Sequence, residues 1–253
     1  MPRLLVTRPT AQAEPWVREL IARGVDAIAL PLIEIAPPLD PGPVQAAWAG
    51  LGERGLVVFV SSNAVARFFA ARPADAAWPA SLLAAAPGPG TAEALSAQGL
   101  AAAAIVAPAA EAVQHDSEAL WQQLRLREWR GASVLLVRGD AGRDWLVERL
   151  VEAGARVDAV AAYRRLAPRL SVEAWRSVEA AFAEPASHVW LFSSSEAVAR
   201  LEALPGVTIG PGTRALATHP RIAARARQAG FADVSEVQPG LDAVVACIQS
   251  MQP

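Results

Sequence analysis

The stretch VVFVSSNAVARFF, residues 57–69, decides the fold because it joins the pattern of a buried strand directly to that of a helix. Four apolar residues at 57–60 are typical of a strand buried on both faces, and the Ala, Val and Phe residues of 64–69 recur at helical spacing. Between them stand Ser61, Ser62 and Asn63, residue types that commonly cap helices. The stretch LFSSSEAVARL, residues 191–201, repeats the arrangement. Both stretches predict a strand followed at once by a helix, the unit of a parallel α/β sheet.

The same alternation continues along the chain. Strand-like apolar runs alternate with helical patterns, which predict helices at about 10–23, 43–52 and 62–71. Similar features recur at nearly one offset in the sequence. Arg8 and Arg138 follow equivalent predicted strands and are 130 residues apart. Gly24 and Gly154, which are expected to end helices, are separated by the same 130 residues. We therefore expect an internal duplication of roughly 130 residues and two parallel-sheet α/β domains.

Composition limits the classes of ligand and site. The 253 residues are 53% hydrophobic, enough for sizeable cores, and 23 basic against 25 acidic residues give a net charge of −2 without charge runs. We therefore expect no nucleic-acid stripe and no membrane-binding patch. Every basic residue is Arg, which excludes lysine Schiff bases and suits carboxylate binding. Three scattered His and one Cys predict no metal site, and the lack of a signal or membrane span predicts a cytoplasmic protein.

Ligands of open α/β sheets bind beyond the carboxyl ends of the strands, where helices begin. Ser61, Ser62 and Asn63 lie at such a place, and Ser194 and Ser195 lie at the corresponding place in the second half. These side chains either cap the helices alone or also bind a ligand. In PGPGTAEAL, residues 87–95, Gly90 and Thr91 lie in a strand-to-helix turn that can bind an anion but lacks both the dinucleotide and the P-loop pattern.

Arg138 and Gly139 are expected to follow a strand directly, with a helix opening at about 143. Such a turn presents a guanidinium and backbone donors to a carboxylate. The alternative is an ion pair of Arg138 with Asp140 or Asp144.

His219 and Arg221 lie at another predicted helix start, where Pro220 suits the first helical position. His219 either meets a ligand anion or bonds only to backbone.

Tyr163 is the single tyrosine and stands at the end of an apolar strand, before Arg164 and Arg165. It is either an amphipathic plug at the surface or a proton donor. The two arginines would favour a phenolate or anchor an anion.

Taken in order, several short motifs resemble uroporphyrinogen-III synthases over nearly the whole chain: LLVTRP, SSNAV, GxGTA, LLVRGDAGR, VAAYRR, SSSEAV and HPRIA…AGF. The resemblance implies two α/β domains with a cleft between them, one of residues 1–36 with 171–253 and one of 37–165. They would be joined by linker strands near 30–37 and 160–170. The implied activity is a lyase that cyclises hydroxymethylbilane to uroporphyrinogen III, with inversion of the terminal pyrrole, in haem biosynthesis. No cofactor or metal is implied.

The resemblance also implies roles for particular residues. Tyr163 matches the family tyrosine proposed as a general acid for departure of the hydroxyl. Ser61, Thr91 and Ser194 match polar positions that face the cleft, and arginines are candidates for the propionates. The family's Gly-Pro-Thr-Thr turn is replaced here by residues 219–222, so that His and Arg would substitute as donors. The expected substrate-binding residues are Arg8, Ser61, Ser62, Asn63, Gly90, Thr91, Arg138, Gly139, Ser194, Ser195, His219 and Arg221.

A non-catalytic, two-lobed binding module for an anionic small molecule is the competing hypothesis. For either function we expect a monomer with a small-molecule ligand, and the synthase reading leaves open a transient contact with the preceding pathway enzyme.

Overall fold

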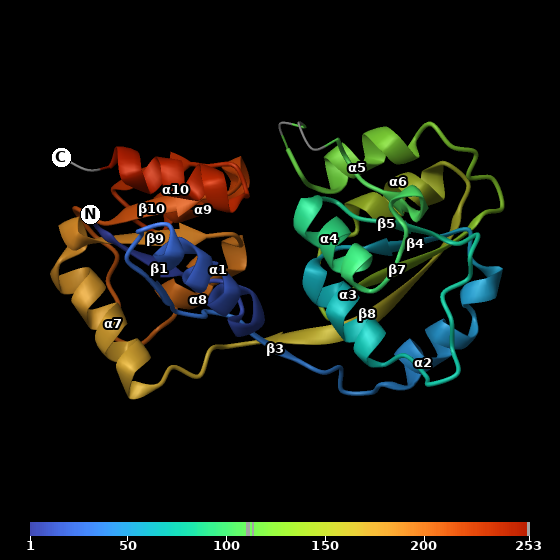
Figure 1. Ribbon diagram of the computed structural model, residues 1–253, viewed down its shortest axis with the longest axis horizontal. Helices are drawn as coiled ribbons and strands as arrows, with labels where there is room; N and C mark the ends of the chain where they lie inside the picture. The colour runs from blue at the N-terminus through green and yellow to red at the C-terminus, as the bar shows by residue number, and fades with distance from the viewer. Residues whose placement is uncertain (110–111, 113, 252–253) are drawn as a thin grey trace. The chain divides into compact units, whose positions relative to one another are not determined.

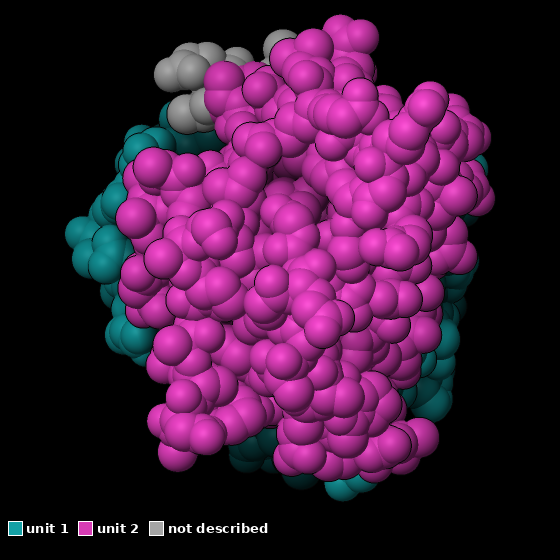
Figure 2. Space-filling model, turned by 90° about the vertical axis from the view of Figure 1, so that its right-hand side faces the viewer, with its two compact units in different colours: residues 1–34, 166–253 teal, residues 35–165 magenta. Residues whose placement is uncertain are grey.

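The computed structural model describes residues 1–109, 112 and 114–251 and divides the chain into two compact units. Unit 1 comprises residues 1–34 and 166–253, and unit 2 comprises residues 35–165; Figure 2 colours them separately. Unit 2 is therefore one continuous segment, whereas unit 1 is assembled from both ends of the chain.

Unit 1 contains a five-stranded sheet in the order β11-β10-β9-β1-β2, whose pairings are all parallel. Its strands are β1 (Arg3–Val6), β2 (Ala27–Ala29), β9 (His188–Phe192), β10 (Arg214–Ala217) and β11 (Asp233–Glu236). Its helices are α1 (Thr10–Ala22), α7 (Val172–Ala183), α8 (Ser195–Glu202), α9 (Pro220–Gln228) and α10 (Leu241–Ser250), with a 3₁₀ turn, η3 (Pro185–Ser187).

Side chains alternate across this sheet, as a strand requires. Leu4, Val6 and Leu191 belong to one core cluster with apolar residues of α1 and α10. Figure 1 shows these two helices beside the sheet of unit 1. Trp190 and Phe192 belong instead to an aromatic cluster with Phe182 and Phe231. The sheet is thus buried on both faces, which explains why its strands read as continuous apolar runs rather than as alternating ones.

Unit 2 contains a six-stranded sheet in the order β3-β8-β7-β4-β5-β6. Its strands are β3 (Glu34–Ala36), β4 (Leu56–Phe59), β5 (Leu83–Ala85), β6 (Ile105–Val106), β7 (Ser133–Gly139) and β8 (Arg156–Leu166). Its helices are α2 (Gly42–Ala49), α3 (Ser62–Ala70), α4 (Pro89–Ala97), α5 (Ser117–Leu124) and α6 (Trp145–Glu152), with 3₁₀ turns η1 (Leu51–Glu53) and η2 (Ala102–Ala104). The chain crosses between the units within β3 and at the end of β8.

An aromatic cluster covers one face of this second sheet. Trp48 stacks on Phe68 with 4.8 Å between ring centroids, and Phe59, Phe69 and Trp78 complete the cluster. The opposite face packs against leucines of α5 and α6. Unit 2 therefore has a complete core of its own.

The two sheets share one strand order. Unit 1 reads β2-β1-β9-β10-β11, and unit 2, apart from its extra edge strand β3, reads β8-β7-β4-β5-β6, so that β1 corresponds to β7 and β9 to β4. Gly24 and Gly154 occupy equivalent positions after α1 and α6, with positive φ values of 79° and 98° that favour glycine. This agreement supports the expected duplication, which stays a prediction.

Most expected helices lie where the sequence placed them, with small shifts at their ends. The helix expected at 43–52 ends at Ala49, and the helix expected from about 143 begins at Trp145. Arg138 and Gly139 lie within β7 and not after it, which corrects the expected strand end. The strand is longer because its pairing with β8 continues, through a register shift, as far as Gly139 opposite Tyr163. Within the described residues, no helix is long and apolar enough to cross a membrane.

Candidate functional site

Tyr163 lies on β8 with its side chain wholly buried, 0% exposed. Its hydroxyl lies 3.1 Å from Oγ of Ser61, and it accepts a hydrogen bond of 3.0 Å from Nη2 of Arg165. These residues come from the ends of β4 and β8, which flank β7 in the sheet. The single tyrosine is thus not a surface plug but the centre of a buried polar cluster, which we call the Tyr163 cluster and define as Ser61, Gly139, Tyr163 and Arg165.

Gly139 provides the surface on which the tyrosine ring lies. A Cβ at this position would stand 2.9 Å from Cε2 of Tyr163 and 3.3 Å from its hydroxyl oxygen, closer than real Cβ contacts allow. Only glycine lets β7 pass so near the phenol. Gly139 was expected to bind substrate; the structure places it against Tyr163.

Ser61 is the N-cap of α3. Its Oγ accepts a hydrogen bond of 3.2 Å from the backbone N–H of Ala64, which would otherwise lack a helical partner. Ser62 and Asn63 form the first turn of the same helix and, like Ser61, are half-buried. Ser61 is therefore observed as a helix cap that also contacts Tyr163, and its binding to a ligand stays a prediction.

The two arginines after Tyr163 diverge because consecutive residues of a strand point to opposite faces. Nε of Arg164 donates to the carbonyl of Pro37 at 3.0 Å. Arg165 instead turns back to Tyr163, and its Nη1 donates to the carbonyl of Ala141 at 3.3 Å. Its backbone N–H also donates to Oδ1 of Asp140 at 3.3 Å. Arg165 is the residue that the expected site omitted; only its adjacency to Tyr163 signalled it.

Gly90 and Thr91 lie in the first turn of α4, which follows β5. Thr91 is 7% exposed and belongs to the described buried polar residues. Because β5 neighbours β4, the starts of α3 and α4 lie at adjacent strand ends of one sheet.

Arg138 forms an ion pair with Asp144, with 2.5 Å between Nη1 and Oδ1. The side chain of Asp144 is 60% exposed, so the pair lies at the surface. This contact is one of the two alternatives left open for Arg138. A surface carboxylate can be exchanged for another, and a role in substrate binding stays a prediction.

Unit 1 places a second set of expected residues at the carboxyl ends of its own strands. Ser194 is the N-cap of α8, where its Oγ accepts from the N–H of Glu196 at 3.1 Å, and Ser195 is the first residue of that helix. His219 is the N-cap of α9, where Nδ1 accepts from the N–H of Arg221 at 3.0 Å. Arg221 is exposed in the first turn of α9. Backbone capping by His219 is therefore observed, and its contact with a ligand stays a prediction.

Arg8 follows β1 and lies with its guanidinium carbon 3.8 Å from the ring centroid of Trp16. Its Nε is buried and has no hydrogen-bond partner among the residues that the structure describes. Burial lowers the pKa of Arg8 below its ordinary value, to about 10. A desolvated cation stacked on an aromatic ring is suited to receive an anion. Sequence reasoning missed Trp16, because no pattern links positions 8 and 16.

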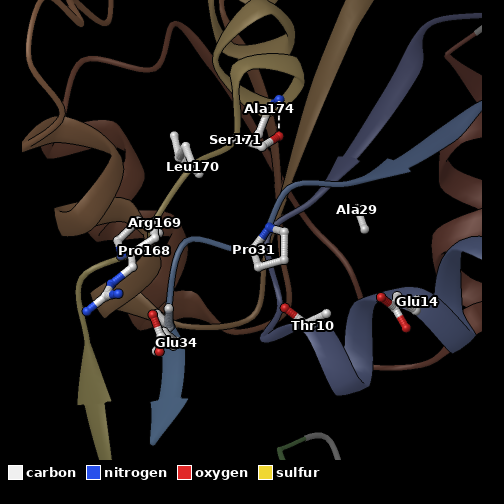
Figure 3. A pocket seen from close by; sticks show the side chains of 11 residues that line it. Thr10, Glu14, Ala29, Pro31, Glu34, Pro168, Arg169, Leu170, Ser171 and Ala174 are labelled. Atoms are coloured by element: carbon white, nitrogen blue, oxygen red, sulfur yellow. Dashed lines mark hydrogen bonds between the residues drawn. The ribbon is translucent and has the colours of Figure 1, made fainter.

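A surface pocket of about 400 Å³ lies elsewhere in unit 1 (Figure 3). Thr10, Glu14, Glu34, Arg169 and Ser171 are among its polar lining residues, and Figure 3 shows Ser171 bonded to the backbone of Ala174. None of the expected site residues lines it. Among the described residues, no three His, Cys, Asp or Glu side chains gather as metal ligands would.

Comparison with known proteins gives consistent names. Residues 14–246 match the family model of uroporphyrinogen-III synthase HemD. The uroporphyrinogen-III synthase of Salmonella typhimurium is 34% identical over 165 residues, 65% of each chain, so the matched part falls just short of two thirds of that relative. The enzyme of the same name from Proteus mirabilis is 32% identical over 166 residues, 64% of this chain and 80% of that one.

Two solved structures share the fold. A mutant uroporphyrinogen III synthase of Thermus thermophilus has a TM-score of 0.60 at 19% identity, covering 99% of this chain and 98% of that chain. The Helicobacter pylori uroporphyrinogen-III synthetase has a TM-score of 0.56 at 15% identity, with both chains covered completely. These likenesses concern the α/β fold. Because the family model extends over most of the sequence, from residue 14 to residue 246, the chain belongs to the uroporphyrinogen-III synthase family.

Proposed function

We propose that this protein is a uroporphyrinogen-III synthase, a lyase that cyclises hydroxymethylbilane to uroporphyrinogen III with inversion of the terminal pyrrole ring. The observation that carries the proposal is the family match together with the Tyr163 cluster, which joins a proton donor to a hydroxyl and a fixed cation.

The reaction needs little acid–base catalysis from the protein. An electron-rich pyrrole expels its hydroxyl readily, and closure without an enzyme gives the uninverted isomer. The protein has to hold a flexible polyacid in the conformer from which the substituted carbon of the last ring attacks, through a spiro intermediate. Holding such a substrate calls for cations and small hydrogen-bonding groups at helix starts.

Residues of both units supply groups of this kind. Arg8 and Arg138 are the proposed partners of substrate carboxylates, and Arg221 is a further donor. Hydroxyl, amide, imidazole and backbone groups at helix starts and strand ends would complete the site: Ser61, Ser62, Asn63, Gly90, Thr91, Gly139, Ser194, Ser195 and His219. The partnership of Arg8 is supported by its half-buried position over Trp16 and by its buried Nε, which has no hydrogen-bond partner among the described residues.

Tyr163 is the proposed general acid for departure of the hydroxyl. Its hydrogen bonds to Ser61 and Arg165 support this role, because they orient a protonated phenol at the ends of the strands. We further propose that the two compact units are the two domains of the enzyme, linked through β3 and β8.

The decisive experiment incubates the protein with freshly prepared hydroxymethylbilane and resolves the uroporphyrinogen isomers by chromatography. We expect the type III isomer, formed faster than the spontaneous reaction. Type I alone, at the rate of buffer, would refute the synthase and favour the binding module for an anionic small molecule.

We also propose that the enzyme is a cytoplasmic monomer. The monomer is supported by the positions of the exposed large apolar side chains among the described residues, because no two of them share a helix or strand: Met1, Ile21, Leu39, Leu126, Val151 and Val172. Light scattering of the purified protein measures its mass in solution. A mass of 26.5 kDa is expected for a monomer, and twice that mass would contradict the proposed monomeric state. A transient contact with the preceding pathway enzyme stays a prediction.

A further inference from the structure

We propose that Tyr163 acts on the substrate through Ser61, and that Arg165 is the positioning residue that directs the phenol proton toward Ser61. This inference rests on the proposed synthase function and names the route of the proton within it.

The hydroxyls of Tyr163 and Ser61 differ in their exposure to solvent. Tyr163 has no exposed surface, whereas Ser61 is half-buried at the start of α3. The phenol oxygen is thus screened from a bound molecule, and the Ser61 oxygen 3.1 Å away is the nearest polar atom that can hand a proton onward. Proton donors work through direct contact or through one intervening hydroxyl or water.

We call the proton route from Tyr163 through Ser61 to the substrate the relay. The numbers of donors and acceptors on Arg165, Tyr163 and Ser61 set its direction. A guanidinium only donates, so the phenol oxygen accepts from Arg165 and its own hydrogen points away from that arginine. Ser61 Oγ already accepts from the N–H of Ala64, and a hydroxyl oxygen has a second lone pair. That lone pair receives the phenol hydrogen, which leaves the serine hydrogen to point outward.

The neighbours of the phenol hold it in this arrangement. Gly139 closes one side of the ring, because even a Cβ there would overlap Cε2 of Tyr163. The backbone N–H of Asp140 donates to the carbonyl of Tyr163 at 2.9 Å, and Arg165 is tied to the same turn through the carbonyl of Ala141. Gly139 therefore limits where the ring can lie, and Arg165 sets the direction of the phenol hydrogen.

The loss of the substrate hydroxyl conserves protons and electrons. Tyr163 gives its proton to Ser61 Oγ while Ser61 gives its own proton to the departing hydroxyl oxygen of the substrate. The carbon–oxygen bond breaks with its electron pair on oxygen, water leaves, and the pyrrole nitrogen lone pair supplies the electron-deficient carbon. Arg165 faces the phenolate so formed. The proton released from the ring carbon at closure returns to Tyr163 through Ser61.

The test is a double-mutant cycle with Tyr163→Phe, measured as kcat, KM and melting temperature. Tyr163→Phe should slow kcat roughly ten- to a hundredfold, at the low end of general-acid effects. Arg165→Gln should lower kcat about tenfold with KM within about twofold, and it should cause no further fall in the Tyr163→Phe background. Arg165→Lys, which keeps one donor, should restore part of the rate.

Ser61 offers a second pair of variants that separates the relay from the helix cap. Asn caps a helix as well as Ser does but has no hydroxyl to relay a proton, whereas Thr keeps both. Ser61→Asn should therefore lose about tenfold in kcat with the melting temperature kept, and Ser61→Thr should recover most of the kcat that Ser61→Asn loses. Arg156→Gln is the matched charge control, because Arg156 lies at the opposite end of β8 and its side chain donates to the carbonyl of Gly131, outside the Tyr163 cluster.

Three outcomes decide the matter. A loss confined to kcat and absent in the Tyr163→Phe background supports the relay. If Arg165→Gln lowers kcat equally in the natural protein and in the Tyr163→Phe variant, or raises KM alone, the relay is overturned. Arg165 would then act on the substrate independently of Tyr163. If the unchanged protein forms only the type I isomer, the proposed function itself fails and the relay with it, which is distinct from type III formation without coupling.

Discussion

At the scale of single residues, the protein keeps two polar side chains in apolar surroundings. Tyr163 is accommodated because both of its hydrogen-bonding partners are supplied by the chain. Arg8 is accommodated differently: Trp16 covers the guanidinium, but within the described part of the chain Nε has no hydrogen-bond partner. A buried polar group without a partner costs stability, so its presence calls for a functional reason.

Arg8→Met should raise the melting temperature by a few degrees, about 1 kcal/mol, and raise KM for hydroxymethylbilane about tenfold. Methionine keeps the stacking on Trp16 without the charge. Thermal unfolding and steady-state kinetics check both effects, with the exposed Arg18→Met on α1 as the control that should change neither. A fall in melting temperature with normal KM would show that the cation is structural.

The pH dependence has a definite sign. Because the pKa of Arg8 is about 10 in the folded protein, below its ordinary value, the unfolded chain binds more protons at pH values between the two. The destabilisation is fully present well below pH 10, and it is relieved as pH rises through the folded pKa toward the ordinary pKa of arginine. At neutral pH the substitution to Met therefore removes the whole penalty.

At the scale of elements, the site depends on how β7 meets its neighbours. The strand carries Arg138 and Gly139 side by side, and the register shift between them allows Gly139 to lie opposite Tyr163. Arg138 reaches Asp144, just before α6, while Gly139 supports the phenol. One strand end thus serves two separate contacts.

Gly139→Ala should displace the Tyr163 ring and cost about 1–3 kcal/mol of stability, together with a lower kcat. The added Cβ would lie 2.9 Å from Cε2 on a strand that packing holds in place. Gly142→Ala in the following loop is the matched control, because nothing lies within 4 Å of a Cβ there. The melting temperature and kcat of Gly139→Ala are compared with those of Gly142→Ala. Equal values for the two variants would contradict the close packing of Gly139 against Tyr163.

Arg138→Ala should leave stability within about 1 kcal/mol, because an exposed ion pair contributes little. If Arg138 exchanges Asp144 for a substrate carboxylate, the variant raises KM while Asp144→Asn does not. Kinetics of both variants and their melting temperatures provide the measurement. A collapsed melting temperature with unchanged KM would assign Arg138 to the fold.

At the scale of the whole molecule, the chain makes two units of unequal construction. Unit 2 is continuous and has its own sheet and aromatic core, whereas unit 1 needs residues 1–34 and 166–253 together. The Tyr163 cluster lies wholly in unit 2, and Arg8, Ser194 and His219 lie in unit 1.

A fragment of residues 35–165 should therefore fold by itself and unfold cooperatively, as a single domain of this size does. It should not form the type III isomer, since the proposed carboxylate partner Arg8 is absent from it. Circular dichroism on heating and the isomer assay provide the two measurements. A fragment without a cooperative transition would show that unit 2 depends on unit 1.

The sequence by itself determined the α/β class, the helix starts at Ser61 and Ser194, and the helix ends at Gly24 and Gly154. These features depend on local periodicity, capping side chains and backbone conformation, which short stretches encode. Motif order also indicated the family, which the family match confirms.

Only the tertiary structure decided which of these residues meet. Ser61, Gly139 and Tyr163 come together because β4, β7 and β8 are neighbours in one sheet, although their positions in the chain are far apart. It also separated Arg165 from Arg164 and placed the half-buried Arg8 against Trp16. Strand order and register set these contacts, and they are properties of long-range packing that no local pattern carries.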